Sequence, residues 1–393
     1  MRVLYICYDD MRGYNGATRH ITEIAKHLQE LGHVVRLCAP LIGKHDPSPQ
    51  VPIIYIPTLG ISYLRMASYC LLSLLFLPIH VFNLKPDVIY IRDIYFTPLP
   101  VILSKILRIP CVLEVNDLVE SVSSISKNNT LKRLLFIVLT WFRRIQFRLC
   151  DKIITVTFEL KDLLDKRYHV GGKVSVIHNG VDTRLFCPMD KIEARKMLKL
   201  DPNRCYVGFV GAFYSWHGLE YLVESVPRII NQLPDVSFLL VGDGKTFPEL
   251  IRLIKKKGLI DKFILPGRVP FAAVPAYINA FDLGINFFKL TQDRAPHSGY
   301  PVKLNEYLAC EKPVIVSTEY EYLIRDINAG ISVDASDPNQ VVNAIVKLRE
   351  EPALCAQMGK NGRREVLENR SWAMKAKETE TVLQTILAKG DLQ

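Results

Sequence analysis

Short apolar runs alternate with longer amphipathic segments along the first half of the chain. The runs that predict buried strands are rich in β-branched and aromatic residues and lie at residues 3–8, 33–38, 86–93, 110–115 and 153–156. Between the first two, residues 21–31 carry apolar side chains at helical spacing, and Gly32 ends the pattern. This alternation predicts a doubly wound parallel sheet.

The same alternation restarts at Tyr206 and continues through the strand 313–317 and the helix 338–351. Prolines at 188 and 202 punctuate the stretch between the two series. We therefore predict an α/β protein with a first Rossmann-like domain at residues 1–184, a linker at 185–203 and a second Rossmann-like domain at 204–370. Residues 371–393 are predicted to form a final helical segment.

Composition limits the classes of partner and compartment. The 393 residues carry a formal net charge of +10, which indicates contact with nucleic acid, an acidic membrane or a phosphorylated substrate. Nine cysteines without close pairs favour a reducing compartment, and no spacing suits zinc. The apolar start is too short for a signal peptide and predicts a first strand.

Residues 296–318 carry the densest candidate chemistry. They predict a tight loop, a short helix at 302–310 that Pro301 starts, and a buried strand. The free amides of a first helical turn attract anions, and Lys303 adds a positive charge on that turn. Glu306 follows one turn later, so the pattern suits a ligand with phosphates at one end and hydroxyls at the other. An ordinary αβ unit with a surface lysine and glutamate is the alternative.

Two loops after predicted strands hold further candidates. Gly16 lies in a glycine-containing loop after the first strand, although that loop lacks the G-x-G-x-x-G spacing of dinucleotide sites. Asn116 and Asp117 follow the strand 110–115, with Glu120 just beyond, where ligands bind in such sheets. The alternatives are a turn without a ligand and a polar cap for the next helix.

Two helices raise the question of a membrane. Residues 63–82 are apolar enough to be considered as a span, but the strand that follows returns to the same sheet, so we predict a buried or interfacial helix. Residues 131–152 combine an apolar side, including Trp141, with five basic residues at 132, 133, 143, 144 and 148. That helix suits an anionic membrane surface or, equally, an amphipathic core position.

Four stretches occur in an order found in a known family: SVIHNGVDTRLF, VGFVGAFYSWHGLEYLVESV, LLVGDG and KLNEYLACEKPVIVS. With these motifs the chain resembles the retaining family-4 glycosyltransferases of the GT-B fold over nearly its whole length. The resemblance implies two doubly wound Rossmann-like domains facing a central cleft, with an acceptor site in the first and a nucleotide-sugar site in the second. It also implies that the last helix packs back on the first domain, with Trp372 at the crossing.

The resemblance assigns roles to residues of this chain. Glu306 is expected to accept hydrogen bonds from the nucleotide ribose, and Lys303 and His217 to stabilise the departing diphosphate. The remaining expected donor contacts are Gly16 beside the diphosphate, Arg268 and Val269 at the base, and Ser298, Gly299 and Tyr300 at the sugar and β-phosphate. Asn116 and Asp117 are the catalytic candidates on the acceptor side.

Four positions depart from the family pattern. Ala212 and His217 stand where an Arg and a Lys usually reach the donor phosphates. Asn116 stands where many members have a histidine, and Ser298 replaces the first glutamate of the Glu-x7-Glu motif. The identity of the sugar and the catalytic role beside it therefore stay open.

The sequence thus predicts transfer of a sugar from a nucleoside-diphosphate donor to an acceptor hydroxyl, with retention, without a metal and without a cofactor other than the nucleotide-sugar co-substrate. A lipid-linked or envelope glycan is the expected acceptor, and the expected location is cytoplasmic or on the inner membrane face. A nucleotide-sugar 2-epimerase and a non-catalytic, membrane-associated subunit are the alternatives. Nucleic acid is disfavoured because no recognition motif accompanies the basic helix.

Overall fold

The computed structural model describes residues 1–11, 16–42, 51–59, 62–117, 130–291 and 300–390. They form two compact units. Unit 1 comprises Met1–Gly180, Ala295–Tyr300 and Trp372–Gln393, and unit 2 comprises Val181–Arg294 and Pro301–Ser371. The chain therefore leaves unit 1 after Gly180, touches it again at Tyr300 and returns to it for its last helix.

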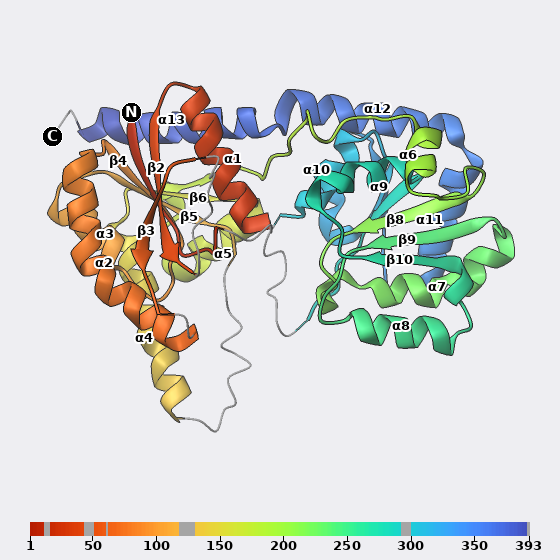
Figure 1. Cartoon of the computed structure of the whole chain (residues 1–393), viewed down its shortest axis with the longest axis horizontal. Helices are drawn as coiled ribbons and strands as arrows, with labels where there is room; N and C mark the ends of the chain where they lie inside the picture. The colour runs from red at the N-terminus through yellow and green to blue at the C-terminus, as the bar shows by residue number, and fades with distance from the viewer. Residues whose placement is uncertain (12–15, 43–50, 60–61, 118–129, 292–299, 391–393) are drawn as a thin grey trace. The chain divides into compact units, whose positions relative to one another are not determined.

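Unit 1 is built on a seven-stranded parallel sheet with the order β3-β2-β1-β4-β5-β6-β7 (Figure 1). Its strands are β1 (Arg2–Ile6), β2 (Val34–Leu41), β3 (Ile53–Pro57), β4 (Val88–Arg92), β5 (Cys111–Val115), β6 (Lys152–Thr155) and β7 (Val174–Val176). The strand order reverses between β1 and β4, which is where open parallel sheets bind ligands at their carboxyl ends.

Helices cover both faces of this sheet. The helices of unit 1 are α1 (Gly16–Glu30), α2 (Ser62–Leu84), α3 (Leu99–Ile106), α4 (Thr130–Leu149), α5 (Phe158–Tyr168) and α13 (Trp372–Gly390). α1 packs against α13, while α2 packs against α3 and α3 against α4. Trp372 is 1% exposed and lies in one core cluster with Ile21 and Leu28 of α1. The last helix thus completes the core of unit 1.

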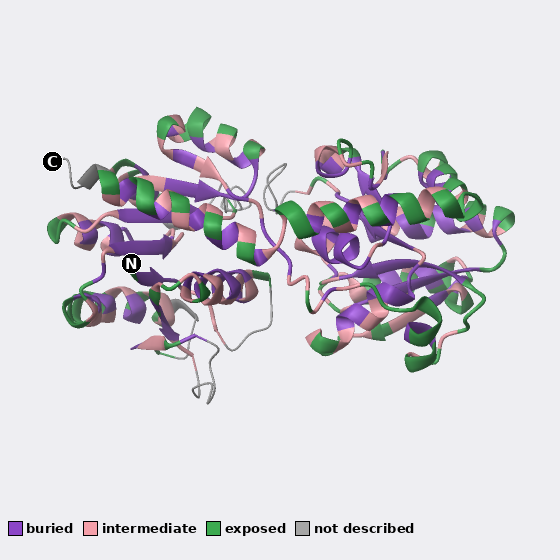
Figure 2. Ribbon diagram, turned by 90° about the horizontal axis from the view of Figure 1, so that it is seen from above, coloured by how far each residue is buried: buried purple, intermediate pink, exposed green. Residues whose placement is uncertain are grey.

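Unit 2 repeats the architecture with a six-stranded parallel sheet in the order β10-β9-β8-β11-β12-β13. Its strands are β8 (Cys205–Val210), β9 (Val236–Val241), β10 (Phe263–Gly267), β11 (Leu283–Asn286), β12 (Val314–Ser317) and β13 (Gly330–Val333). Its helices are α6 (Lys191–Met197), α7 (Leu219–Gln232), α8 (Phe247–Lys256), α9 (Val274–Ala280), α10 (Val302–Ala309), α11 (Pro338–Glu350) and α12 (Pro352–Asn369). Figure 2 shows the strands buried and the helices exposed along their outer faces.

The prediction of two doubly wound parallel sheets is confirmed, because every strand pair in both sheets is parallel. Such strands are covered on both faces and are therefore apolar throughout, which made them visible in the sequence. Residues 185–203, predicted as a linker, include the helix α6, which packs against α9. Arg195 of α6 is 2% exposed and pairs with Asp282 at 2.6 Å.

Candidate active site

The carboxyl ends of β8 and β9 meet backbone to backbone in unit 2. Gly211 follows β8, and its amide donates to the carbonyl of Val241 at 3.0 Å. A Cβ added to Gly242 would lie 1.9 Å from the carbonyl oxygen of Gly211, and Gly242 has φ +135°. Only glycine fits at this contact. The loop after β8 is consequently held close to the sheet, and Lys303 lies above it.

Lys303 lies in the first turn of α10 and reaches this loop. Its Nζ is 3.4 Å from Nδ1 and 3.3 Å from Nε2 of His217, and 4.1 Å from the centroid of the Phe209 ring. The same Nζ would be 2.9 Å from a Cβ at Gly211. A primary amine, an imidazole and the start of a helix therefore converge beside the end of β8, and this combination suits a phosphate group.

The turn that carries His217 is fixed by its neighbours. Residues Ser215–His217 form a short 3-10 turn that ends at Gly218, with φ +55°. The ring of Tyr214 stacks on Trp216 with centroids 4.4 Å apart. The carbonyl of Trp216 accepts a hydrogen bond from the amide of Lys289 at 2.8 Å. This packing holds the imidazole of His217 toward Lys303.

Helix α10 is anchored to β8 through Tyr307. The amide of Val210 donates to the Tyr307 hydroxyl at 2.7 Å, and Tyr307 is fully buried. Glu306 precedes it and is 8% exposed. Because Lys303 and Glu306 are one turn apart on this anchored helix, their relative position is set by the helix itself. The structure thus brings together Lys303 and His217 and places Glu306 one turn further along α10.

The other predicted donor residues lie at several places. Arg268 follows β10 and is exposed, and Val269 is half-buried. Gly16 is the first residue of α1, and a Cβ there would meet no heavy atom within 4 Å. Tyr300 is 6% exposed, and its ring stacks on His178 with centroids 5.2 Å apart. Ser298, Gly299 and Glu120 lie outside the described residues.

A buried ionic network lies at the carboxyl ends of β1, β4 and β5 in unit 1. Its centre is Glu114, which is fully buried in β5. Oε2 of Glu114 accepts hydrogen bonds from the hydroxyls of Tyr5 at 2.9 Å and Tyr90 at 2.6 Å. Oε1 lies 2.8 Å from a guanidinium nitrogen of Arg92 and 3.0 Å from Nε2 of His20. One carboxylate therefore holds two tyrosines, an arginine and a histidine together.

The environment of Glu114 favours its ionised form. Burial by itself raises the pKa of this carboxyl, but the charge and hydrogen bond of His20, the charge of Arg92 and the Tyr90 hydroxyl together lower it well below its ordinary value. Arg92 also lies 3.3 Å from Asp9. The network thus keeps a negative charge inside unit 1 at neutral pH.

Asn116, one of the predicted catalytic residues, belongs to this network. Its Nδ2 donates to Oε1 of Glu114. Its Oδ1 is buried and has no hydrogen-bond partner among the residues that the structure describes. Asp117 is exposed, and its carbonyl lies 3.5 Å from a guanidinium nitrogen of Arg143. Glu114 therefore orients Asn116, and Oδ1 of Asn116 remains as an acceptor without a partner in the described part of the chain.

Sequence reasoning missed Glu114, His20, Arg92 and Asn179. Nδ1 of His20 lies 2.7 Å from Oδ1 of Asn179, which ties the network to the SVIHNGVD motif. A signal was present, because a charged residue in the apolar strand PCVLEV requires partners when both faces of the strand are buried.

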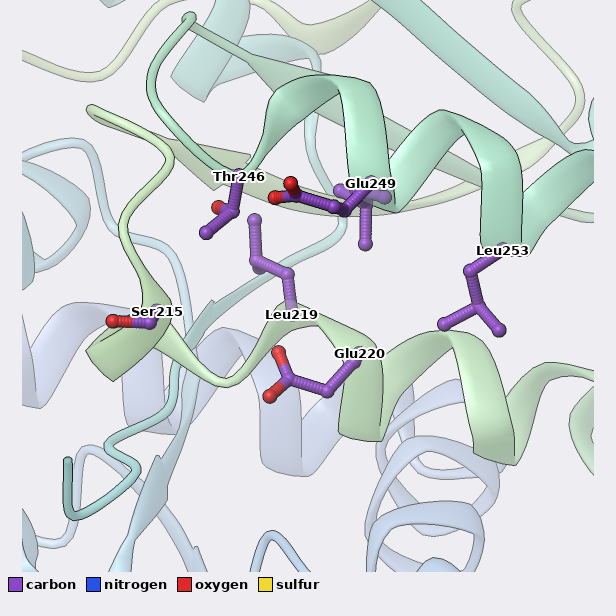
Figure 3. Close-up of a pocket in the computed structure, with 7 residues that line it drawn as sticks. Ser215, Leu219, Glu220, Thr246, Glu249 and Leu253 are labelled. Atoms are coloured by element: carbon purple, nitrogen blue, oxygen red, sulfur yellow. The ribbon is translucent and has the colours of Figure 1, made fainter.

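A separate cavity of about 180 Å³ lies between the starts of α7 and α8 (Figure 3). It is lined by Ser215, Leu219, Glu220, Thr246, Glu249, Leu250 and Leu253. Glu220 pairs with Lys289 at 2.6 Å. Two carboxylates on leucine walls do not suit a phosphate, and none of the predicted donor residues lines this cavity. Within the described part of the chain, no group of three or more His, Cys, Asp and Glu side chains is arranged to hold a metal ion.

Comparison with known proteins defines the class. The fold is that of GT-B glycosyltransferases: an Anabaena protein solved in complex with UDP superposes with a TM-score of 0.76 at 18% identity, over 98% of this chain and 100% of that one. Residues 14–185 match the family model described as Glycosyltransferase Family 4, and residues 204–351 match Glycosyl transferases group 1. The chain belongs to the family-4 glycosyltransferases, as its motifs predicted.

Curated relatives are similar over part of their length. An uncharacterised glycosyltransferase of Methanocaldococcus jannaschii is 28% identical over 225 residues, which is 56% of each chain. The Escherichia coli UDP-Gal:α-D-GlcNAc-diphosphoundecaprenol α-1,3-galactosyltransferase is 25% identical over 291 residues, or 72% of this chain and 71% of the relative. The chain spans 56% of the length of this Methanocaldococcus jannaschii protein, and 60% and 61% of the lengths of two other curated relatives.

Proposed function

We propose that the protein transfers a sugar, with retention of its anomeric configuration, from a nucleoside-diphosphate sugar to a hydroxyl of a lipid-linked or envelope glycan. The observation that carries the proposal is the position of Lys303 in the first turn of α10, with its Nζ 3.3 Å from the ring of His217 and Glu306 one turn beyond. This arrangement offers positive charge to a diphosphate and a carboxylate to the hydroxyls of a ribose.

Two of the similar proteins support the choice of substrates. The Anabaena neighbour binds UDP, and the relative from E. coli acts, by its name, on a diphosphoundecaprenol acceptor. A net charge of +10 suits a phosphorylated donor and an acceptor at an anionic membrane. The proposal does not specify the identity of the nucleotide base. Arg268 and Val269 are the residues that would contact it.

In this proposal the residues of unit 2 act on the leaving group. Negative charge develops on the diphosphate as its bond to the sugar breaks, and Lys303, His217 and the first amides of α10 stabilise it. Glu306 accepts hydrogen bonds from two ribose hydroxyls and thereby fixes the donor. The departing phosphate takes the proton of the acceptor hydroxyl, so no protein carboxylate serves as a nucleophile and no metal is required.

In unit 1, Asn116 would contact the substrate on the acceptor side. Glu114 holds its Nδ2, which leaves the buried Oδ1 as an acceptor without a partner among the described residues. A sugar hydroxyl is the matching donor. Asn116 can accept a hydrogen bond but does not carry a charge, and it would therefore position a hydroxyl and leave its deprotonation to the phosphate.

The donor half of the proposal is tested by thermal unfolding against a panel of nucleoside diphosphates and nucleotide sugars. A ligand at a hundredfold excess over its Kd stabilises the folded state by about 2.7 kcal/mol, which raises the melting temperature by several degrees. We expect one nucleotide class to give this shift and Glu306→Ala to abolish it. Glu350→Ala, at an exposed position at the end of α11, should retain it. No shift with any nucleotide would refute the proposal.

The transfer itself is tested by following release of the nucleoside diphosphate with membrane lipid extracts as acceptors. We expect release to depend on the extract and to persist in EDTA, and the product to show the anomeric configuration of the donor by NMR. Release without an acceptor, together with an epimerised sugar, would instead identify a nucleotide-sugar 2-epimerase.

A further inference from the structure

An exposed apolar stripe runs along the whole of α2. The side chains that form it recur at helical spacing and are exposed by 49% to 76%: Leu64, Leu71, Leu74, Leu75, Ile79 and Phe82. By length and composition alone, the part of α2 from Leu64 to Leu84 could cross a membrane, and 22% of its apolar window is buried. Exposed stripes of this length mark interaction sites in proteins.

The opposite side of α2 is packed on unit 1. Tyr69, Leu77 and Val81 are buried there, and the Tyr69 hydroxyl donates to the carbonyl of Cys7 at 3.2 Å. Oγ of Ser68 accepts a hydrogen bond from the amide of Leu59 at 3.0 Å. A helix that crossed a bilayer would lose these contacts. The helix is therefore suited to lie along a surface, with one side on the protein and the other outward.

The two neighbouring helices also carry exposed apolar side chains. α3 packs against α2 and against α4, and the three helices lie side by side in Figure 1. At the end of α3, Ile106 is 70% exposed and Leu107 is 42% exposed. On α4, Ile137 and Trp141 are exposed by 55% and 57%. We call the exposed apolar side chains of α2, α3 and α4 the three-helix surface.

The charged side chains of the three helices themselves have one sign. None of α2, α3 and α4 contains an aspartate or glutamate, although the chain has 40 of them. Exposed basic residues follow the apolar ones on α4 at Arg144 and Arg148 and after α3 at Arg108. A second copy of the same surface would bring like charges together. An anionic lipid bilayer matches both the apolar side chains and the positive charge.

The structure corrects the prediction for the basic helix in one respect. Arg143 is one of the five basic residues expected to face the membrane or solvent, but its side chain is 8% exposed and pairs with Asp93. Burial beside Asp93 fixes Arg143 inside unit 1. The membrane-facing charges of α4 in the described residues are therefore Arg144 and Arg148.

We propose that the three-helix surface docks on the face of an anionic bilayer, with the apolar side chains of α2 inserted among the lipids. The inference that the acceptor is lipid-linked rests on the proposed function, whereas the inference that the surface docks on a membrane does not. Docking holds unit 1, which carries Asn116, at the membrane. An acceptor attached to a lipid would then meet the protein by diffusion within the membrane plane.

Co-sedimentation with vesicles tests this. The full-length protein is mixed with vesicles of phosphatidylcholine alone or with phosphatidylglycerol, at low and high salt. We expect binding only to the anionic vesicles, weakened by salt. Each basic residue near an anionic surface contributes about fivefold in binding, so Arg144→Gln with Arg148→Gln should reduce it by roughly tenfold or more. The control is Arg252→Gln with Arg325→Gln, two exposed positions in unit 2, which should change little.

The apolar contribution is tested separately with Leu75→Ser and Phe82→Ser. Together they should reduce binding to anionic vesicles at least tenfold, while Met197→Ser and Leu367→Ser, at exposed positions of unit 2, should not. Trp141 should show a blue-shifted emission on vesicles and quenching by brominated lipid, with Trp141→Phe as the reference. Nucleotide-induced thermal shifts should survive in all these variants, which separates failure of docking from failure of the proposed function.

Three outcomes would overturn the proposal. Equal binding by the stripe variants and the wild type would show that another surface meets the lipid. Absence of vesicle binding together with a dimer that Leu75→Ser and Phe82→Ser dissociate would assign the surface to a second copy. Retention of the protein in membranes after alkaline carbonate extraction would show that α2 spans the bilayer.

Discussion

Replacing Glu114 by glutamine should destabilise unit 1 strongly, because the side chain keeps its shape and loses its charge. The amide oxygen of glutamine can still accept hydrogen bonds from Tyr5 and Tyr90. Its NH2 group would then face the guanidinium of Arg92 and Nε2 of His20, which lie 2.8 Å and 3.0 Å from the present oxygen. Removing one partner of a buried ion pair costs about 3–5 kcal/mol, because the other charge stays buried without compensation.

Hydrogen exchange measures this cost within one unit. The protein has two units, so a single unfolding transition is not guaranteed, whereas exchange reports each strand separately. A loss of about 3 kcal/mol accelerates exchange through unfolding by about a hundredfold. We expect that acceleration for the amides of β1 and β5 in the Glu114→Gln variant. The amides of β8 in unit 2 serve as the internal reference, and Glu30→Gln on α1 is the matched surface control.

The effect should also depend on pH with a definite sign. The pKa of Glu114 is lowered in the folded protein, while an unfolded glutamate titrates near about 4.3. Its contribution to stability is therefore fully present above that value and is lost as the pH falls below it. The difference in stability between the wild type and Glu114→Gln should therefore shrink as the pH falls below about 4. The absence of a stability difference between the two proteins at pH 7 would refute the assignment of Glu114 as the ionised centre of the network. A stability difference that stays constant down to pH 3 would refute it as well.

Three further results are expected from unit 2. Lys303→Met keeps a long side chain over Phe209 but removes the charge, so kcat/KM should fall by about a hundredfold or more. Lys256→Met, at an exposed position of α8, should change it little, and equal losses would argue against a phosphate role for Lys303. Gly242→Ala should lower the free energy of unfolding by several kcal/mol, measured with denaturant, because its Cβ would meet the Gly211 carbonyl. Gly258→Ala is the control: its φ is +66° but the space around it is open, so it should cost only about 1–2 kcal/mol. Similar costs for the two variants would contradict the steric argument. Burial lowers the pKa of Lys312 to about 8, so the unfolded state binds more protons than the folded state above that pH. The free energy of unfolding should therefore rise by up to about 3 kcal/mol between pH 8 and about 10.4. Lys312→Met should lack this rise, and parallel stability curves of the two proteins against pH would refute the lowered pKa.

The sheets were accessible from the sequence because their strands are buried on both faces. Continuous apolar runs such as VGFV in β8 are short and rich in β-branched and aromatic residues, so their length and composition identify them. The start of α10 was also accessible, since Pro301, Lys303 and Glu306 lie within one short segment. Local spacing therefore predicted the architecture and the pair Lys303 and Glu306, whereas the other donor-side candidates came from the family resemblance.

The network around Glu114 was not accessible in this way. Tyr5, Tyr90 and Glu114 come from three strands that lie far apart in the sequence and become neighbours only because the order is β1-β4-β5. Strand order depends on how the crossovers turn, which periodicity does not encode. The role of Arg143 was missed for the same reason, because its partner Asp93 follows a different strand.

The return of the chain to unit 1 has a consequence for synthesis on the ribosome. Trp372, Ala376, Leu383 and Ile386 of α13 are buried in the same core cluster as α1. The first segment of unit 1 is translated before unit 2 but lacks these four side chains until every segment of unit 2 has been made. The second unit is thus the first that can fold completely, and a stop codon shortly before Trp372 would leave the earlier half exposed to proteases.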